Sequence, residues 1–220
     1  MPFEKYFEWV EKWLKECYRV LKDDGRIAIN IPVEVSNQHD ESGHDRVFML
    51  SEYHQIMKTL NFHTAGVIRL AENHPQIRNR TAWGSWMSAS APYIRNPDEH
   101  VLLYYKNQWK RLTSGTSTMT KEDFIKNVSG RWDYIAETKC LTAAGFSLDF
   151  PLTAINMLTY KDVDVVLDPF MGSGTTALAC VMTDRQYIGF EISENYWKIA
   201  NNRIQNHVDR GNCALKDMME

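Results

Sequence analysis

Hydrophobic and polar positions follow two different periods along the chain, and these periods predict helices that alternate with strands. Over residues 3–21, apolar side chains recur every three or four positions, which is the spacing of one helical face. Residues 26–32, RIAINIP, instead form a short apolar run typical of a buried strand. By the same criteria we expect further helices over residues 51–60, 150–160, about 175–183 and 193–207, and further strands over 63–70, 99–106, 163–167 and 186–191.

This alternation predicts the fold class, because helices between apolar strands are typical of an α/β fold with a mostly parallel sheet. Signals at the segment ends agree with it. Gly25 and Asn61 stand at the ends of the first two helices, and Ser51 and Ser193 stand at helix starts as candidate N-caps. The segments without clear periodicity are 36–46, 71–97 and 107–147, the last being the candidate insertion.

The composition narrows the class of protein. With 220 residues, 44% hydrophobic and 24% charged, the chain suffices for one large domain with a real core. No apolar run approaches the roughly 18–20 residues that span a bilayer, and the charged start MPFEKYFEWV does not resemble a signal peptide. The four cysteines form no Cys-x-x-Cys pair, which argues against a zinc or disulfide framework and indicates a reducing cytoplasm. His39 and His44 lie in one polar loop without a second ligand cluster, so we predict no metal site.

The charge is unevenly distributed. The net charge is −3, but residues 69–131 hold ten basic and five acidic side chains, against fifteen basic and twenty-three acidic elsewhere. A basic middle in an acidic chain favours a local contact with a polyanion such as nucleic acid, and a chance cluster in a solvated loop would look the same.

The most informative stretch is Asp168–Thr176, DPFMGSGTT, which joins a predicted strand to a predicted helix. Gly172 and Gly174 would let the backbone approach a ligand closely, and the helix that starts near Thr175 would present unpaired N–H groups. No lysine follows the glycines, so this is not a P-loop, and Ala177 satisfies only the looser form of the dinucleotide pattern.

Two acids define the ligand that this turn would suit. Glu191 ends the next strand, where a carboxylate grips the ribose diol in dinucleotide sites. Asp168 lies at the strand tip and could face a cationic ammonium group. The pair therefore suits a nucleoside with a positive tail better than one with phosphates, and S-adenosylmethionine is such a molecule.

The nine-residue string, followed by RQYIGFEISENYWKIANNRI, resembles the cofactor motif of amino-directed DNA methyltransferases. The resemblance implies a Rossmann-like methyltransferase fold, with a mostly parallel seven-stranded-type sheet flanked by helices. It implies methyl transfer from S-adenosylmethionine to adenine N6 or cytosine N4 in DNA, in a restriction–modification system with a cognate endonuclease, and it is compatible with a homodimer. The implied cofactor-binding residues are Asp168, Pro169, Phe170, Gly172, Ser173, Gly174, Thr175, Glu191, Phe150 and Pro151.

The late position of the motif resembles the permuted β class of this family, in which the catalytic half comes first. Residues 1–106 would then be the catalytic-side half, 107–145 a short target-recognition region and 146–220 the cofactor-binding half. The implied DNA contacts are Arg78, Arg80, Trp83, Trp86, Lys110 and Arg111. For the tryptophans the alternative is packing beneath a loop, and for the basic residues it is a solvated loop surface.

The family's catalytic tetrapeptide, Asp, Asn or Ser followed by Pro-Pro and an aromatic residue, is absent, because none of the seven prolines are adjacent. Ser90–Tyr93, SAPY, is a near match in the wrong place. We therefore leave the catalytic residues unassigned and expect a missing upstream strand and catalytic loop, with impaired or absent catalysis. The alternatives are a non-catalytic cofactor- or DNA-binding remnant and a methyltransferase acting on RNA or a small molecule. The target base and the recognised DNA sequence stay undetermined.

Overall fold

The computed structural model describes residues 2–36, 45–72, 96, 98–134 and 145–217; the side chains of residue 72 and of 210–217 are outside that description. The chain divides into two compact units. Unit 1 comprises residues 1–113 and 128–133, and unit 2 comprises 114–127 and 134–220. The predicted recognition region 107–145 is therefore shared between the units.

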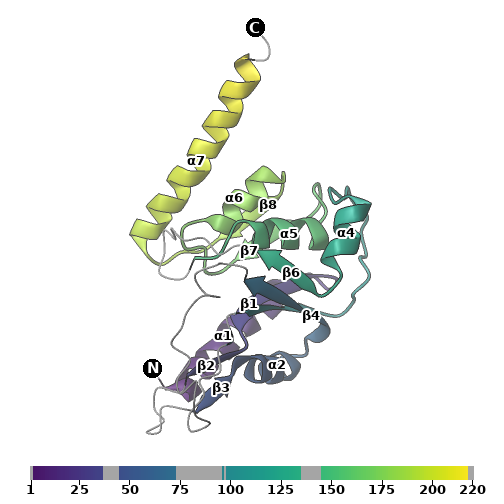
Figure 1. Ribbon diagram of the computed structural model, residues 1–220, viewed down its shortest axis with the longest axis vertical. Coiled ribbons are helices and arrows are strands. Elements are labelled where there is room, and N and C mark those ends of the chain that lie inside the picture. The colour runs from purple at the N-terminus through teal and green to yellow at the C-terminus, as the bar shows by residue number, and fades with distance from the viewer. Residues whose placement is uncertain (1, 37–44, 73–95, 97, 135–144, 218–220) are drawn as a thin grey trace, which may run out of the picture. The chain divides into compact units, whose positions relative to one another are not determined.

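Unit 1 is built on a sheet with strand order β1-β5-β4-β6, of which Figure 1 labels β1, β4 and β6. Its strands are β1 (Arg26–Pro32), β4 (His63–Glu72), β5 (Glu99–Tyr105) and β6 (Arg131–Tyr134), and a separate two-stranded sheet pairs β2 (Glu34–Ser36) with β3 (Arg46–Phe48). Both β1 and β4 pair antiparallel with β5, which lies between them. Thus β1 and β4 share one direction and β5 runs opposite to both, so these pairs are antiparallel, unlike the mostly parallel sheet that the sequence predicted.

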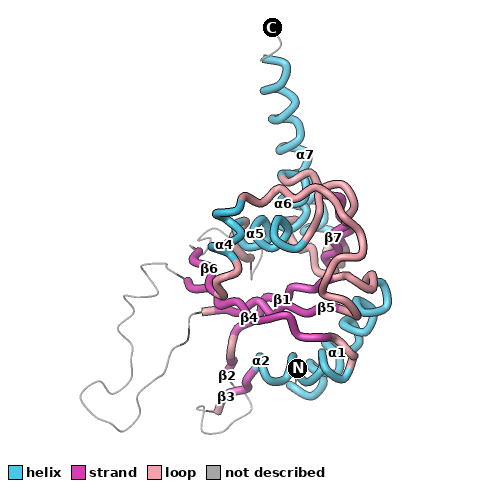
Figure 2. Tube along the Cα trace, turned by 90° about the vertical axis from the view of Figure 1, so that its right-hand side faces the viewer, coloured by secondary structure: helices cyan, strands magenta, loops and turns pink. Residues whose placement is uncertain are grey.

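Two helices, α1 (Phe3–Val20) and α2 (Met49–Thr59), pack on one side of this sheet, as Figure 2 shows. The periodic face predicted for the first helix is confirmed, because Val10 and Leu14 of α1 are fully buried. They pack in one cluster with Met57 of α2 and with Leu102 and Tyr104 of β5. Apolar burial of this kind is the main favourable term in folding, and it explains why the pattern of these segments predicted them.

The start of α2 differs from the prediction. Ser51 is not its N-cap, since the helix begins at Met49 and the cap position is Phe48, which makes no side-chain cap hydrogen bond. The Leu50 amide instead donates to the Val33 carbonyl, so the backbone supplies a partner that a serine would otherwise provide. The end of α2 agrees with expectation, because Asn61 has φ +64°, the left-handed conformation that asparagine tolerates.

A buried ion pair closes unit 1 where β1 begins and β5 ends. Arg111 Nε donates to Asp24 Oδ2 at 3.0 Å, and the side chains are 10% and 5% exposed. The Leu112 amide donates to the same oxygen at 2.8 Å. Burial raises the pKa of Asp24, but the Leu112 amide and Arg111 outweigh it, so the pKa lies below its ordinary value. This contact clasps residues 111 and 112 to the turn before β1.

Unit 2 holds the parallel pairing. Its elements are α4 (Lys121–Asn127), α5 (Asp149–Leu158), β7 (Val165–Asp168), α6 (Thr175–Met182), β8 (Gln186–Gly189) and α7 (Glu194–Asp217). β7 and β8 run parallel, joined through α6 as a strand–helix–strand unit. Ile155 of α5 and Cys180 of α6 form a core cluster against Val166 of β7 and Tyr187 of β8. The predicted α/β class is confirmed, and its parallel strand–helix–strand unit lies in unit 2.

Several elements were absent from the prediction. The β2–β3 pair flanks the predicted polar loop 36–46, and α4 and β6 occupy parts of the segment 107–147. The helix α7 also continues to Asp217, ten residues beyond its predicted end. None of the helices in the described part of the chain combines the length and apolar character needed to cross a bilayer. Within the same part of the chain no group of three or more metal-ligating side chains gathers; His39 and His44 lie outside it.

Candidate cofactor-binding site

The glycine turn links the carboxyl end of β7 to the amino end of α6, as the sequence predicted. Gly172 and Gly174 have φ values of +54° and +81°, a left-handed backbone that other residues rarely adopt. A side-chain carbon added at Gly174 would lie 2.8 Å from Cβ of Ala200 in α7. The turn therefore needs glycine here both for its conformation and for its close approach to α7.

Backbone hydrogen bonds tie the turn to the end of β8. The Phe190 amide donates to the Asp168 carbonyl at 3.0 Å, and the Met171 amide donates to the Phe190 carbonyl at 2.9 Å. The first hydrogen bond of α6 runs from the Leu178 amide to the Gly174 carbonyl. The amides of residues 175–177 thus precede the first intrahelical bond and face the loop, where they can serve as donors.

Glu191 has a second role that the sequence did not reveal. Its Oε2 accepts from the Gly172 amide and its Oε1 from the Ser193 amide, both at 2.7 Å. One carboxylate therefore joins the glycine turn to the start of α7. Because an ionised carboxylate offers about four acceptor positions, two remain for a ligand such as a ribose diol. The half-buried position of Glu191 is consistent with that use.

The start of α7 carries the predicted cap. Ser193 Oγ accepts from the Tyr196 amide at 3.4 Å, which confirms Ser193 as the N-cap. Further along α7, Arg203 reaches the turn, where its Nη1 donates to the Ser173 carbonyl at 2.8 Å, to Ser173 Oγ at 3.0 Å and to Thr175 Oγ1 at 3.2 Å. The sequence alone does not indicate this role of Arg203. Arg203 lies one helical turn after Ala200, so both are on one face of α7, but only the structure shows that this face meets the glycine turn.

Asp168 stands at the tip of β7, half-buried, and its Oδ1 accepts from the Phe170 amide at 2.9 Å. The charge of Asp168 also acts on the thiol of Cys180 in α6. Burial of the Cys180 thiol raises its pKa to about 12, and the nearby Asp168 carboxylate adds to the rise while Arg185 opposes it. The place of Asp168 at a strand tip agrees with the sequence, and its contact with a cationic group stays a prediction.

The comparisons with known proteins fit this geometry. The family model described as DNA methylase matches residues 2–202. The Type II methyltransferase M.MjaVI of Methanocaldococcus jannaschii is 38% identical over 139 residues, which span 63% of this chain and 68% of that protein. M.HindIII of Haemophilus influenzae is 25% identical over 234 residues, which span 96% of this chain and 72% of that protein.

The chain belongs to the DNA methylase family.

Solved structures agree on the fold. TTHA0409 of Thermus thermophilus, solved in complex with S-adenosyl-L-methionine, superposes with a TM-score of 0.74 at 24% identity, over 93% of this chain and 78% of that one. The cytosine-N4-specific PvuII DNA methyltransferase gives a TM-score of 0.68 at 18% identity, over 90% and 70%. The predicted family and Rossmann-like fold are confirmed, and with them the S-adenosylmethionine cofactor that this N6/N4 family uses.

The residues around the glycine turn fit S-adenosylmethionine. Two half-buried carboxylates with unused acceptor positions suit a diol and an ammonium group, and the amides at the start of α6 suit a carboxylate. Phe150 and Pro151 lie at the start of α5, with Pro151 buried and the Phe150 ring 5.3 Å from that of Phe146. Their contact with the cofactor stays a prediction.

The predicted DNA contacts receive different placements. Arg78, Arg80, Trp83 and Trp86, and also Ser90–Tyr93, lie outside the described residues. Lys110 is exposed, so its position is compatible with a phosphate contact. The Arg111 side chain is 10% exposed and paired with Asp24, so its geometry favours the structural clasp of unit 1 over a contact with DNA.

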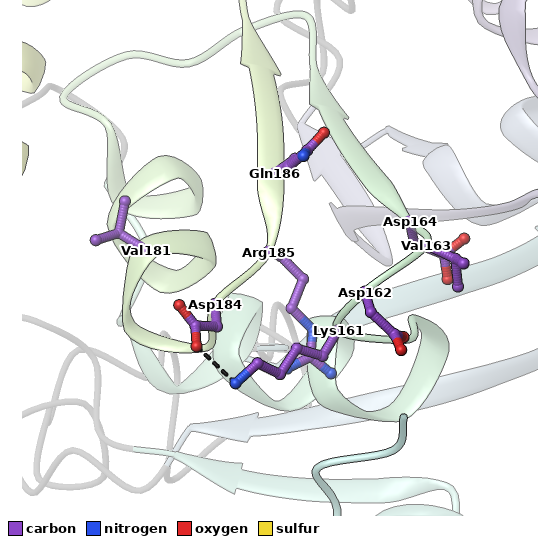
Figure 3. Close-up of a pocket in the computed structure, with 8 residues that line it drawn as sticks. All are labelled: Lys161, Asp162, Val163, Asp164, Val181, Asp184, Arg185 and Gln186. Carbon is purple, nitrogen blue, oxygen red and sulfur yellow. Dashed lines mark ion pairs between the residues drawn. The ribbon is translucent and has the colours of Figure 1, made fainter. Parts of the chain in front are cut away.

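A cavity of about 410 Å³ lies at the other end of the β7–β8 pair (Figure 3). It is lined by Lys161, Asp162, Val163, Asp164, Val181, Asp184, Arg185 and Gln186, with Lys161 Nζ 2.6 Å from Asp184 Oδ2. All of these residues except Val181, which belongs to α6, lie at or just before the amino ends of the two strands. Ligands of open α/β sheets bind outside the carboxyl ends, where the glycine turn lies, so the cavity is not the cofactor site.

Proposed function

We propose that this chain binds S-adenosylmethionine at the glycine turn and acts in site-specific methylation of adenine N6 or cytosine N4 in duplex DNA. The observation that carries the proposal is the Glu191 carboxylate, which organises the turn and keeps acceptor positions open beside it. When bound, S-adenosylmethionine supplies an electrophilic methyl group. Asp168 and Glu191 orient the molecule and take no part in methyl transfer.

We place the chain in a restriction–modification system of the cytoplasm. Type II methyltransferases such as M.MjaVI and M.HindIII are its relatives, and a cognate endonuclease and a homodimer belong to this proposal. Exposed Lys110 is proposed to contact DNA phosphates, together with Arg78, Arg80, Trp83 and Trp86. Arg111 is left out of this set because it is committed to Asp24.

A second function is favoured by one observation. The sequence contains no Pro-Pro-aromatic tetrapeptide, the element whose carbonyl and polar side chain would engage the target amino group. The chain would then bind the cofactor and DNA without transferring the methyl group.

One experiment separates these functions. Calorimetry with S-adenosylmethionine measures cofactor binding, and transfer of a radiolabelled methyl group to duplex DNA, with RNA as competitor, measures catalysis. Binding with transfer to DNA supports the methyltransferase, and binding without transfer supports the non-catalytic form. Glu191→Ala should abolish binding, whereas Glu194→Ala, an exposed acid three residues further on that pairs with Lys198, should leave it unchanged. Equal affinity of both variants and wild type would overturn the site assignment.

A further inference from the structure

The contacts of Arg203 concern the shape of the glycine turn, not the ligand itself. Its three acceptors belong to two residues of the turn, and the Ser173 and Thr175 residues are only 7% and 8% exposed. A buried hydroxyl without a partner is costly, so these groups depend on the donor that α7 supplies. The acceptors belong to the residues immediately before and after Gly174, and together they fix the position of the guanidinium.

The same face of α7 shapes the turn in a second way. Gly174 packs against Ala200, which lies one turn before Arg203. A Cβ atom added at Gly174 would lie only 2.8 Å from Cβ of Ala200. A larger residue at 200 would push the turn away, and a residue without donors at 203 would release it. The small side chain of Ala200 and the donors of Arg203 thus act together on the glycine turn from one face of α7.

We infer that Arg203 is a positioning residue of the cofactor site, which holds residues 173–175 so that the amides at the start of α6 are aligned before the cofactor arrives. A site already aligned loses less conformational entropy on binding, and this raises the affinity. Arg203 touches no part of the cofactor in this role. The expected effect on cofactor affinity rests on the proposed function. The expected effect on the structure of the turn does not.

Three variants test the inference. Arg203→Met keeps the aliphatic stem and removes the donors, and Arg203→Lys keeps the charge and a donor. The matched control is Lys198→Met, which changes an exposed cation on the same helix that pairs with Glu194 at 2.6 Å. Hydrogen exchange of residues 171–178 is measured in the protein without cofactor, and the dissociation constant for S-adenosylmethionine is measured by calorimetry below the melting temperature.

We expect Arg203→Met to speed exchange in residues 171–178 and to weaken cofactor binding by about tenfold or more, the loss typical of hydrogen bonds to a charged group. Arg203→Lys should recover part of both effects, and Lys198→Met should resemble wild type. A general stabilising role would instead raise exchange equally in β8 and α5. That pattern, or exchange and affinity of Arg203→Met both within about twofold of wild type, would overturn the inference.

Two further outcomes also decide the role of Arg203. If Arg203→Met does not fold, Thr175→Val removes one of the acceptors alone and should shift exchange and affinity in the same direction, with no shift overturning the inference. If wild type does not bind S-adenosylmethionine, the proposed function fails, while the exchange of residues 171–178 still decides the role of Arg203.

Discussion

The two units use polar side chains in opposite ways. In unit 1, Asp24 and Arg111 are almost completely buried, and a backbone amide adds to the pair, so the carboxylate is committed to the fold. In unit 2, Glu191 accepts hydrogen bonds from two backbone amides, but it stays half-buried and keeps acceptor positions open. The comparison teaches that similar numbers of hydrogen bonds can serve stability or binding, and that exposure separates the two uses.

The apolar contacts differ in the same sense. The sheet of unit 1 contributes fully buried residues such as Val101 and Leu102 of β5. In unit 2, alternate residues of β7 face in different directions: Val166 packs in the core, whereas Val165 and Leu167 are 49% and 37% exposed. We therefore expect substitutions in unit 1 to act on stability first and substitutions around the glycine turn to act on ligand binding first.

The largest expected effect comes from Gly174→Val. A β-branched residue would have to adopt φ +81° and would meet Cβ of Ala200 at 2.8 Å, so the turn must move. Left-handed strain and overpacking each cost about 1–3 kcal/mol, which corresponds to a loss of cofactor affinity of roughly a hundredfold or more. Calorimetry with S-adenosylmethionine measures this. Gly66→Val is the matched control in unit 1, since nothing lies within 4 Å of its added carbon, and it should bind normally.

If Gly174→Val bound the cofactor as well as Gly66→Val does, the turn would not be the binding element, and the contrast between the units would fail.

The next effect should be confined to stability. Asp24→Asn removes the carboxylate of the buried pair with Arg111, and breaking a buried ion pair in this way costs about 3 kcal/mol. Denaturant unfolding measures it, and the affinity for S-adenosylmethionine should not change. Asp133→Asn provides the control, because Arg131 and Asp133 are both about half exposed and surface pairs of this kind contribute little to stability. Equal losses in the two variants would show that the Asp24 clasp is not special.

Acid should remove the same contribution. The pKa of Asp24 is lowered in the folded protein, so its carboxylate stabilises the fold above the pKa of the unfolded chain, and that stability is lost as pH falls through the folded value. The difference in unfolding free energy between wild type and Asp24→Asn should be constant near neutrality and shrink below about pH 4. Unfolding curves across this range measure it, and a gap that widens on acidification would contradict the assignment.

The sequence made the strands, most helices and the glycine turn predictable because each carries a local signal. The face of α1 is periodic, β1 is a continuous apolar run, and DPFMGSGTT is a rare string. The contacts made by Arg203, Arg111 and the second role of Glu191 have no such signal. Each depends on residues 19 to 87 positions apart in the chain that meet only after folding.

The same reasoning explains one error, at Ser51, and one prediction that the geometry disfavours, at Arg111. Ser51 has the side chain of an N-cap, but the Leu50 amide already has a partner in Val33, and tertiary structure moved the helix start. Arg111 stands in a basic stretch that resembles a phosphate-binding loop, but in the folded chain it pairs with Asp24, 87 positions away in the sequence. A charged side chain reads the same in sequence whether its partner is DNA or its own fold.

The smallest expected effect concerns thiol reactivity, and it is tested by comparing the alkylation rates of one cysteine from each unit. Burial holds the pKa of Cys180 in α6 near 12, so this thiol should stay protonated and unreactive with iodoacetamide at about pH 8. Cys17 in α1 is half-buried and should react faster, as mapped by mass spectrometry of peptides. Asp168→Asn removes the smaller cause of the shift and should leave Cys180 protected, because burial is the larger cause. Rapid labelling of Cys180 in the native protein would instead mean that the core around α6 opens readily. The core of unit 2 would then be less stable than its burial of Cys180 suggests.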